Sequence, residues 1–108
     1  MREGEQQPDE KGSQKMKTAE IKIRGWKTET ETGMITFERG DWFCIARFCD
    51  VFAIAKQYKK DGWNDNGAYA CAAREIVKDW IKDGAPVVQH SETFNRMVDA
   101  IVEAVKNN

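Results

Sequence analysis

The segment Met34–Lys60 reads MITFERGDWFCIARFCDVFAIAKQYKK and decides the fold, because a strand pattern gives way to a helical one within it. Near its start, Ile35 and Phe37 alternate with polar residues, which is the two-residue period of a half-buried β-strand. From Asp41, whose side chain can cap a first turn, to about Lys59, apolar residues cover most of the circumference of a predicted helix. A helix this apolar belongs at the centre of a fold.

On the N-terminal side, a second alternating stretch, Thr18–Lys27, places Ile21 and Ile23 on one face and polar residues on the other. Joined to Met34–Arg39 through the polar connection 28–33, it predicts an antiparallel β-hairpin. Because two strands alone are marginally stable in water, we expect the apolar face of this hairpin to pack on helices.

On the C-terminal side, the turn formers of Asp61–Gly67 predict a loop, and Ala68–Lys82 predicts a helix with an apolar stripe. The connector Val87–His90 is compatible with a short strand, and Ser91 caps a third, amphipathic helix. The sequence therefore predicts an α+β fold in which an N-terminal antiparallel β-hairpin packs on three α-helices (ββααα). The hairpin and the two later helices can cover the central helix, or a second copy of the chain can cover part of it as a homodimer.

Composition indicates one ordinary globular domain, since the 108 residues are 41% hydrophobic and 32% charged, with a formal net charge of −1. We expect this α+β domain to span residues 16–108, after a disordered tail at residues 1–15 that contains no aromatic or branched aliphatic residue. The sequence leaves open whether that tail is native. Without a run of 18 apolar residues or a signal-peptide pattern, the chain is expected to be cytoplasmic and free of the membrane. Because the net charge is close to zero, the chain has no overall positive potential that would attract a polyanion.

Catalytic and metal-binding patterns are weak. The three cysteines and one histidine lack the close pairing of a zinc site, and Cys44 and Cys49 lie about 140° apart around a helix. Apolar neighbours would raise rather than lower the pKa of each thiol, and His90 is expected to be an exposed connector residue. The segment Asp61–Gly67 does not fit a calcium-binding loop, because aligning Gly67 with the required glycine places Gly62 and Ala73 where acidic ligands are needed. Phosphate-binding and nucleophile-elbow motifs are absent from the sequence. We therefore expect neither an enzyme nor a cofactor.

Two tryptophans stand out because no pattern predicts their burial. Trp26 falls on the polar face of the first predicted strand and Trp63 in the predicted loop, so both are candidate protein-binding residues, since tryptophan is enriched at interaction hot spots. Equally, Trp26 could cover a helix and Trp63 could fold back over a helix junction. A basic-aromatic set suits single-stranded nucleic acid and comprises Lys22, Arg24, Lys27, Lys56, Tyr58, Lys59 and Lys60.

The function expected from these features is a small non-enzymatic protein-binding module that acts as an adaptor or inhibitor by covering a partner's surface. Small domains of this kind occur among the accessory proteins of phages and mobile elements that modulate host proteins. The alternative is a nucleic-acid-binding protein that uses the basic-aromatic face of the hairpin. A phosphate-driven complex weakens steeply with salt, whereas recognition through a tryptophan anchor does not.

Overall fold

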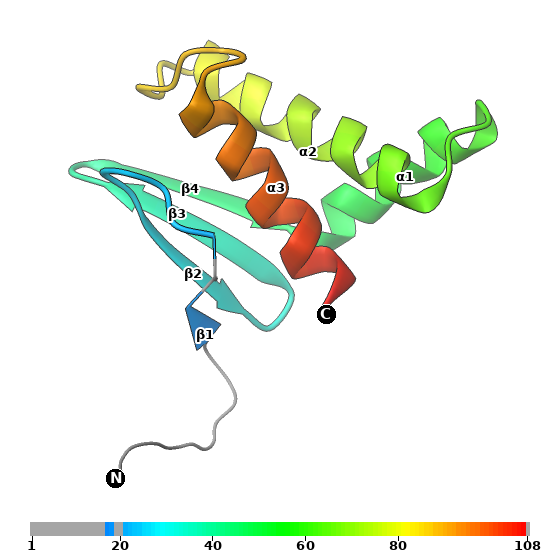
Figure 1. The fold of residues 1–108 in the computed structure, drawn as a ribbon, viewed down its shortest axis with the longest axis horizontal. Helices are drawn as coiled ribbons and strands as arrows, with labels where there is room; N and C mark the ends of the chain where they lie inside the picture. Colours follow the sequence, from blue (N-terminus) through cyan, green and yellow to red (C-terminus); the bar gives the residue numbers. More distant parts are fainter. Residues whose placement is uncertain (1–16, 19–20, 108) are drawn as a thin grey trace, which may run out of the picture.

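The computed structural model describes residues 17, 18 and 21–107, in which an antiparallel sheet is followed by three helices (Figure 1). The predicted disordered tail, residues 1–15, lies outside the described residues. The strands are β1 (Lys17–Thr18), β2 (Lys27–Glu31), β3 (Met34–Arg39) and β4 (Trp42–Arg47), and the helices are α1 (Phe48–Lys60), α2 (Asp65–Lys82) and α3 (Glu92–Lys106). The predicted α+β class, with a hairpin packed on three helices, is confirmed, and β4 extends that hairpin into a larger sheet.

The sheet is a meander with strand order β1-β2-β3-β4, and every neighbouring pair is antiparallel. The predicted strand Met34–Arg39 coincides with β3. The predicted strand Thr18–Lys27 is wrong, because residues 21–26 form a turn in which the Trp26 N–H donates to the Ile23 carbonyl at 3.0 Å. Gly25 has a φ of 83°, a conformation that glycine adopts without steric cost. The strand that pairs with β3 on this side is β2, which begins at the last residue of the predicted strand and continues into the stretch predicted to be a polar connection.

The predicted start of the first helix, Asp41, is also wrong. Gly40 and Asp41 form a two-residue hairpin turn between Arg39 and Trp42, which are paired in the sheet, and Gly40 has a φ of 58°. Glycine at the first central position is typical of the turns that join twisted antiparallel strands. The chain therefore continues as β4, and the helix begins only at Phe48.

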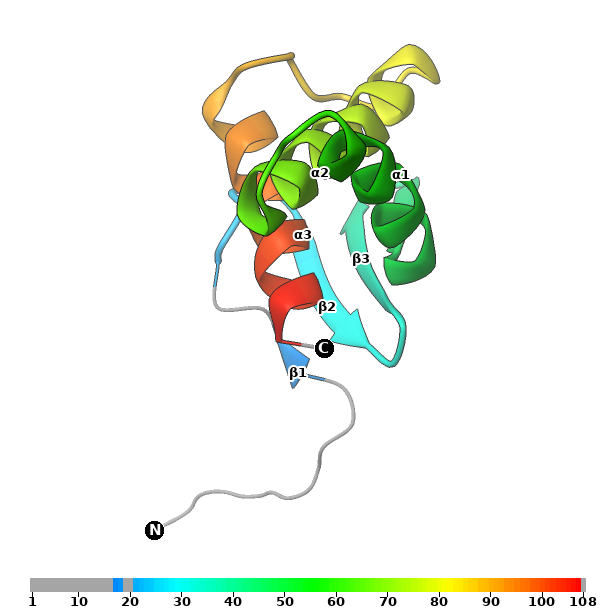
Figure 2. The same cartoon turned by 90° about the vertical axis from the view of Figure 1, so that its right-hand side faces the viewer.

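The three helices lie on one side of the sheet and enclose the core between the two layers (Figure 2). Ile35 and Phe37 of β3 have no exposed surface, and the Phe37 ring meets the edge of Trp80 from α2 at a centroid distance of 5.6 Å. From α3, Phe94, Met97 and Ile101 are equally buried. The core is therefore made by the inner face of the sheet, the facing sides of α2 and α3, and the buried residues Phe48, Val51 and Ala55 of α1.

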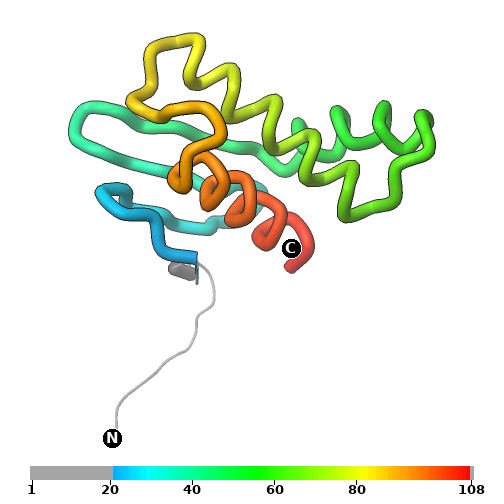
Figure 3. The backbone as a smooth tube through the Cα atoms, turned by 45° about the horizontal axis from the view of Figure 1, so that its top comes forward, coloured from blue at the N-terminus to red at the C-terminus, as the bar shows by residue number. Residues whose placement is uncertain are grey.

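The two later helices are confirmed, and side chains cap both, although α2 begins at Asp65, inside the stretch Asp61–Gly67 predicted to be a loop. Asn64 accepts a hydrogen bond from the Gly67 N–H at 2.8 Å, and Ser91 accepts one from the Phe94 N–H at 3.2 Å. Val87–His90 forms no strand in the structure. The turn between α1 and α2 projects past the end of the sheet (Figures 1 and 3). Over residues 17–18 and 21–107, no helix combines the length and apolar character needed to cross a membrane.

Candidate functional site

Trp26 is buried, which agrees with the alternative that it packs inside the fold and not with the one that exposes it as a protein-binding residue on a strand face. Its side chain is 7% exposed and belongs to the core with Ile23, because the turn at Gly25 directs both side chains inward. The indole Nε1 and the hydroxyl of nearby Thr28 have no hydrogen-bond partner within the described part of the chain. Trp26 therefore acts as a core residue and not as an exposed anchor.

The basic residues around Trp26 are on the surface, as the sequence suggests, but without an aromatic ring among them. Lys22, Arg24 and Lys27 are exposed, and the Lys27 ammonium lies 3.5 Å from the Glu29 carboxylate. The Lys22 carbonyl accepts a hydrogen bond from the Arg96 guanidinium at 3.0 Å, which ties this turn to α3. Burial of the tryptophan removes the stacking platform that this group of cations would need to bind single strands.

The other members of the basic-aromatic set are Lys56, Tyr58, Lys59 and Lys60, which lie in the C-terminal part of α1, where contacts with α2 involve some of them. The Lys59 ammonium lies 3.0 Å from the Asp65 carboxylate and 5.3 Å from the centre of the Tyr69 ring. The hydrogen bond with Asp65 raises the pKa of Lys59. Lys56 and Lys60 are exposed. Since these contacts hold Lys59 in the α1–α2 junction, it is partly neutralised there.

Trp63 is the exposed tryptophan, with 49% of its surface accessible in the turn between α1 and α2. The backbone N–H of Trp63 donates a hydrogen bond to the Tyr58 carbonyl at 3.2 Å. The Trp63 ring packs edge to face against the Tyr58 ring, with 6.1 Å between the ring centroids. Gly67, in the first turn of α2, provides the space for the indole, because a Cβ there would lie 2.7 Å from Trp63 Cε3. The indole is thus held in place by its surroundings while about half of it remains open to a partner.

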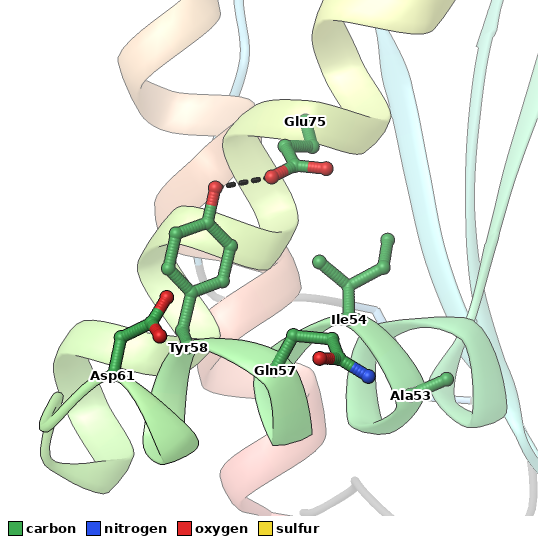
Figure 4. A pocket seen from close by; sticks show the side chains of 6 residues that line it. All are labelled: Ala53, Ile54, Gln57, Tyr58, Asp61 and Glu75. Atoms are coloured by element: carbon green, nitrogen blue, oxygen red, sulfur yellow. Dashed lines mark hydrogen bonds between the residues drawn. The ribbon is translucent and has the colours of Figure 1, made fainter.

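Two adjoining hollows lie at the junction of α1 and α2 and together form a groove, and Figure 4 shows the residues that line the first of them. The first hollow has a volume of about 430 Å³ and is lined by Ala53, Ile54, Gln57, Tyr58, Asp61 and Glu75. A second hollow of about 400 Å³ surrounds Trp63 and shares Asp61 with the first. The lining of the groove therefore combines apolar side chains with two carboxylates and an amide.

The Tyr58 hydroxyl donates a hydrogen bond to the Glu75 carboxylate across this groove (Figure 4). This hydrogen bond is the main cause that raises the pKa of Tyr58 to about 12. A phenol with this pKa stays protonated at neutral pH, so it serves as a donor and fixes the ring against α2. The sequence suggested Tyr58 only as a stacking residue, because nothing in it reveals that Glu75 lies opposite.

The nucleophilic and metal-ligating residues are dispersed. Cys44 is buried in the sheet, where burial raises the pKa of its thiol, whereas Cys49 is exposed on α1 and Cys71 lies on α2. The exposed His90 has a φ of 68°, and its ring packs at 5.4 Å from that of Phe94. Among the residues that the structure describes, no group of three or more His, Cys, Asp or Glu side chains gathers at a point.

No family model matches the chain, and the comparisons with curated proteins and with solved structures also gave no match.

Proposed function

We propose that this chain is a small, non-enzymatic protein-binding module of the adaptor or inhibitor type that acts in the cytoplasm. Its contact surface is the groove between α1 and α2, with Trp63 at the rim. The observation that carries the proposal is the half-exposed indole held against Tyr58 and Gly67. A rigid aromatic side chain beside an apolar hollow loses little conformational entropy on binding, which is the property of an interaction hot spot.

The polar groups of the groove indicate what kind of surface it accepts. Asp61, Glu75 and the amide of Gln57 stand beside the apolar side chains of Ile54 and Tyr58. Carboxylates in the lining favour a partner segment that combines apolar side chains with lysine or arginine. The Tyr58–Glu75 hydrogen bond also keeps the two helices in register, so the groove is formed before a partner arrives.

The experiment is a pull-down from the source cell's lysate, with and without nuclease, using the wild-type chain and a Trp63→Ala variant. The expected result is a discrete partner that survives nuclease and about 0.5 M salt and is lost with Trp63→Ala, since truncated hot spots cost about 2 kcal/mol or more. Val88→Ala is the matched control, because Val88 is 73% exposed on a different loop. Retention of the partner by Trp63→Ala would contradict the proposed surface.

The same experiment tests the nucleic-acid alternative. Lys22, Arg24 and Lys27 remain exposed and available for phosphates, even though Trp26 is buried. Recovery of nucleic acid that is lost as salt rises, and lost in the Lys22→Glu, Arg24→Glu double variant, would favour that alternative over protein binding.

A further inference from the structure

The β4 strand has an open edge. It is the last strand of the sheet, and among residues 17–18 and 21–107 it pairs only with β3, so one side of its backbone has no neighbouring strand there. Two apolar residues lie along this edge: Phe43, which is 58% exposed, and Ile45, which is half-buried. An exposed edge with apolar side chains is a template for pairing with a further strand, and proteins usually protect such edges.

The alternation of the backbone hydrogen bonds along β4 shows which of its residues direct their N–H and C=O groups to the open edge. The Phe48 N–H donates to the Gly33 carbonyl at 3.0 Å, at the end of the β3–β4 ladder. Because backbone groups in an antiparallel strand alternate in direction, Cys44 bonds toward β3, whereas Phe43 and Ile45 direct their N–H and C=O groups to the open edge. Neither residue has another backbone partner in the part of the chain that the structure describes.

The residues along this edge are complementary to themselves when the strand is reversed. The segment Asp41-Trp-Phe-Cys-Ile-Ala-Arg47 consists of the second residue of the β3–β4 turn and the whole of β4, and Cys44 is its midpoint, with an acidic residue three positions before it and a basic residue three positions after. Antiparallel pairing of two copies about Cys44 sets Asp41 of each copy opposite Arg47 of the other. It also sets Phe43 opposite Ile45, an aromatic and β-branched pair of the kind that stabilises sheets.

The register about Cys44 also satisfies the backbone. It makes Phe43 and Ile45 of opposite copies a hydrogen-bonded pair, which gives about four hydrogen bonds across the twofold axis. The side chains of opposed residues in an antiparallel pair lie on the same face of the sheet, so this register joins the inner faces of the two copies to each other and likewise their outer faces. From this match of charge, side-chain face and hydrogen-bond direction, we propose that β4 pairs with β4 of a second copy of this chain to form a continuous sheet across a twofold axis.

The test is sedimentation velocity over about 1 µM to 1 mM protein for the wild type, Asp41→Arg, Arg47→Asp, and an equal mixture of the two variants. The wild type is expected to form dimers. Each variant alone places like charges opposite each other twice per dimer, so its association weakens by about tenfold or more. The mixture regains dimerisation, because both opposed pairs are then of opposite charge. A wild type that stays monomeric, a variant that dimerises like the wild type, or a mixture without recovery would each overturn the proposal.

Cross-linking gives a second test that does not depend on charge reversal. In this register the two Cys44 residues form a non-hydrogen-bonded pair with Cα atoms about 4.5 Å apart, a separation that a disulfide can bridge. A Cys49→Ser, Cys71→Ser chain oxidised with diamide is expected to give covalent dimers through Cys44. Adding Phe43→Pro removes an edge N–H without touching the β3 ladder, so it should abolish them. Failure of the first chain to cross-link, or equal cross-linking with the proline, would overturn the proposal. Trp63 lies between the end of α1 at Lys60 and the start of α2 at Asp65, in the turn that projects past the sheet, so Trp63→Ala is expected to leave dimerisation unchanged.

Discussion

Replacing Phe37 by Ala tests whether the inner face of the sheet is the centre of the core. Phe37 is fully buried and packs edge to face against Trp80 at 5.6 Å. Truncation removes about 130 Å² of buried apolar surface, worth about 3 kcal/mol at roughly 25 cal/mol per Å². Loss of the aromatic pair adds about 0.5–1.5 kcal/mol, so we expect the free energy of unfolding to fall by about 4 kcal/mol.

The assay is urea unfolding followed by tryptophan fluorescence at about 1 µM protein, where self-association contributes little. With a slope of about 1.3 kcal/mol per M, the midpoint is expected to fall by about 3 M. The control is Phe43→Ala, on the neighbouring strand but on the opposite face, with an expected loss below about 1 kcal/mol because that ring is already 58% exposed. If the two variants differed by less than about 1 kcal/mol, the assignment of the two sheet faces would be refuted.

Three further outcomes are expected. Ser91→Ala should lower the free energy of unfolding by about 1 kcal/mol in urea, since it removes the side-chain cap of α3; an unchanged midpoint would contradict this. Glu75→Gln should lower the pKa of Tyr58 from about 12 toward 10 in an ultraviolet titration of a chain whose other tyrosine is replaced. Because the folded pKa is the higher one, the stabilisation from this bond is present below pH 10 and is lost as the pH rises from about 10 to 12; an unshifted titration would refute the role of Glu75. Gly67→Ala should displace the Trp63 indole and shift its fluorescence while leaving the helix intact, and an unchanged emission spectrum would argue against the close contact.

The sequence predicts the elements whose two faces differ clearly. The strand at Met34–Arg39 and the helix capped by Ser91 alternate between apolar and polar residues with the right period, and the structure confirms both. The pattern fails at residues 42–47, because apolar residues point to both faces of β4 and a short run of that kind does not distinguish a strand from a helix. The two-residue turn with Gly40 at its first position was the available signal for a strand.

The candidate site likewise contains features that the local sequence predicts and features that it does not. Trp63 lies in a stretch of turn formers, and its exposure agrees with that position. Trp26 follows Gly25, whose left-handed backbone conformation turns the chain and places the indole in the core. The turn at this glycine thus decides between the two alternatives that the sequence leaves open for Trp26, and only the three-dimensional path of the chain shows which one holds. The Tyr58–Glu75 hydrogen bond joins residues 17 positions apart and has no local signal at all.

The two proposed surfaces have a geometric relation that follows from the chain path alone. Helix α1 leaves the sheet at the C-terminal end of β4, and the turn with Trp63 lies beyond it (Figure 1). When two β4 strands pair antiparallel, their C-terminal ends point in opposite directions, so the two Trp63 grooves lie at opposite ends of the joined sheet. Such a dimer has two separate contact surfaces and can bind two neighbouring copies of a partner at once. Once the first groove is bound, the second is held close to its partner at a high effective concentration, so the overall affinity rises without any new contact. The edge of β4 would therefore determine how strongly the groove holds a clustered partner, while Trp63 and Tyr58 determine what it recognises.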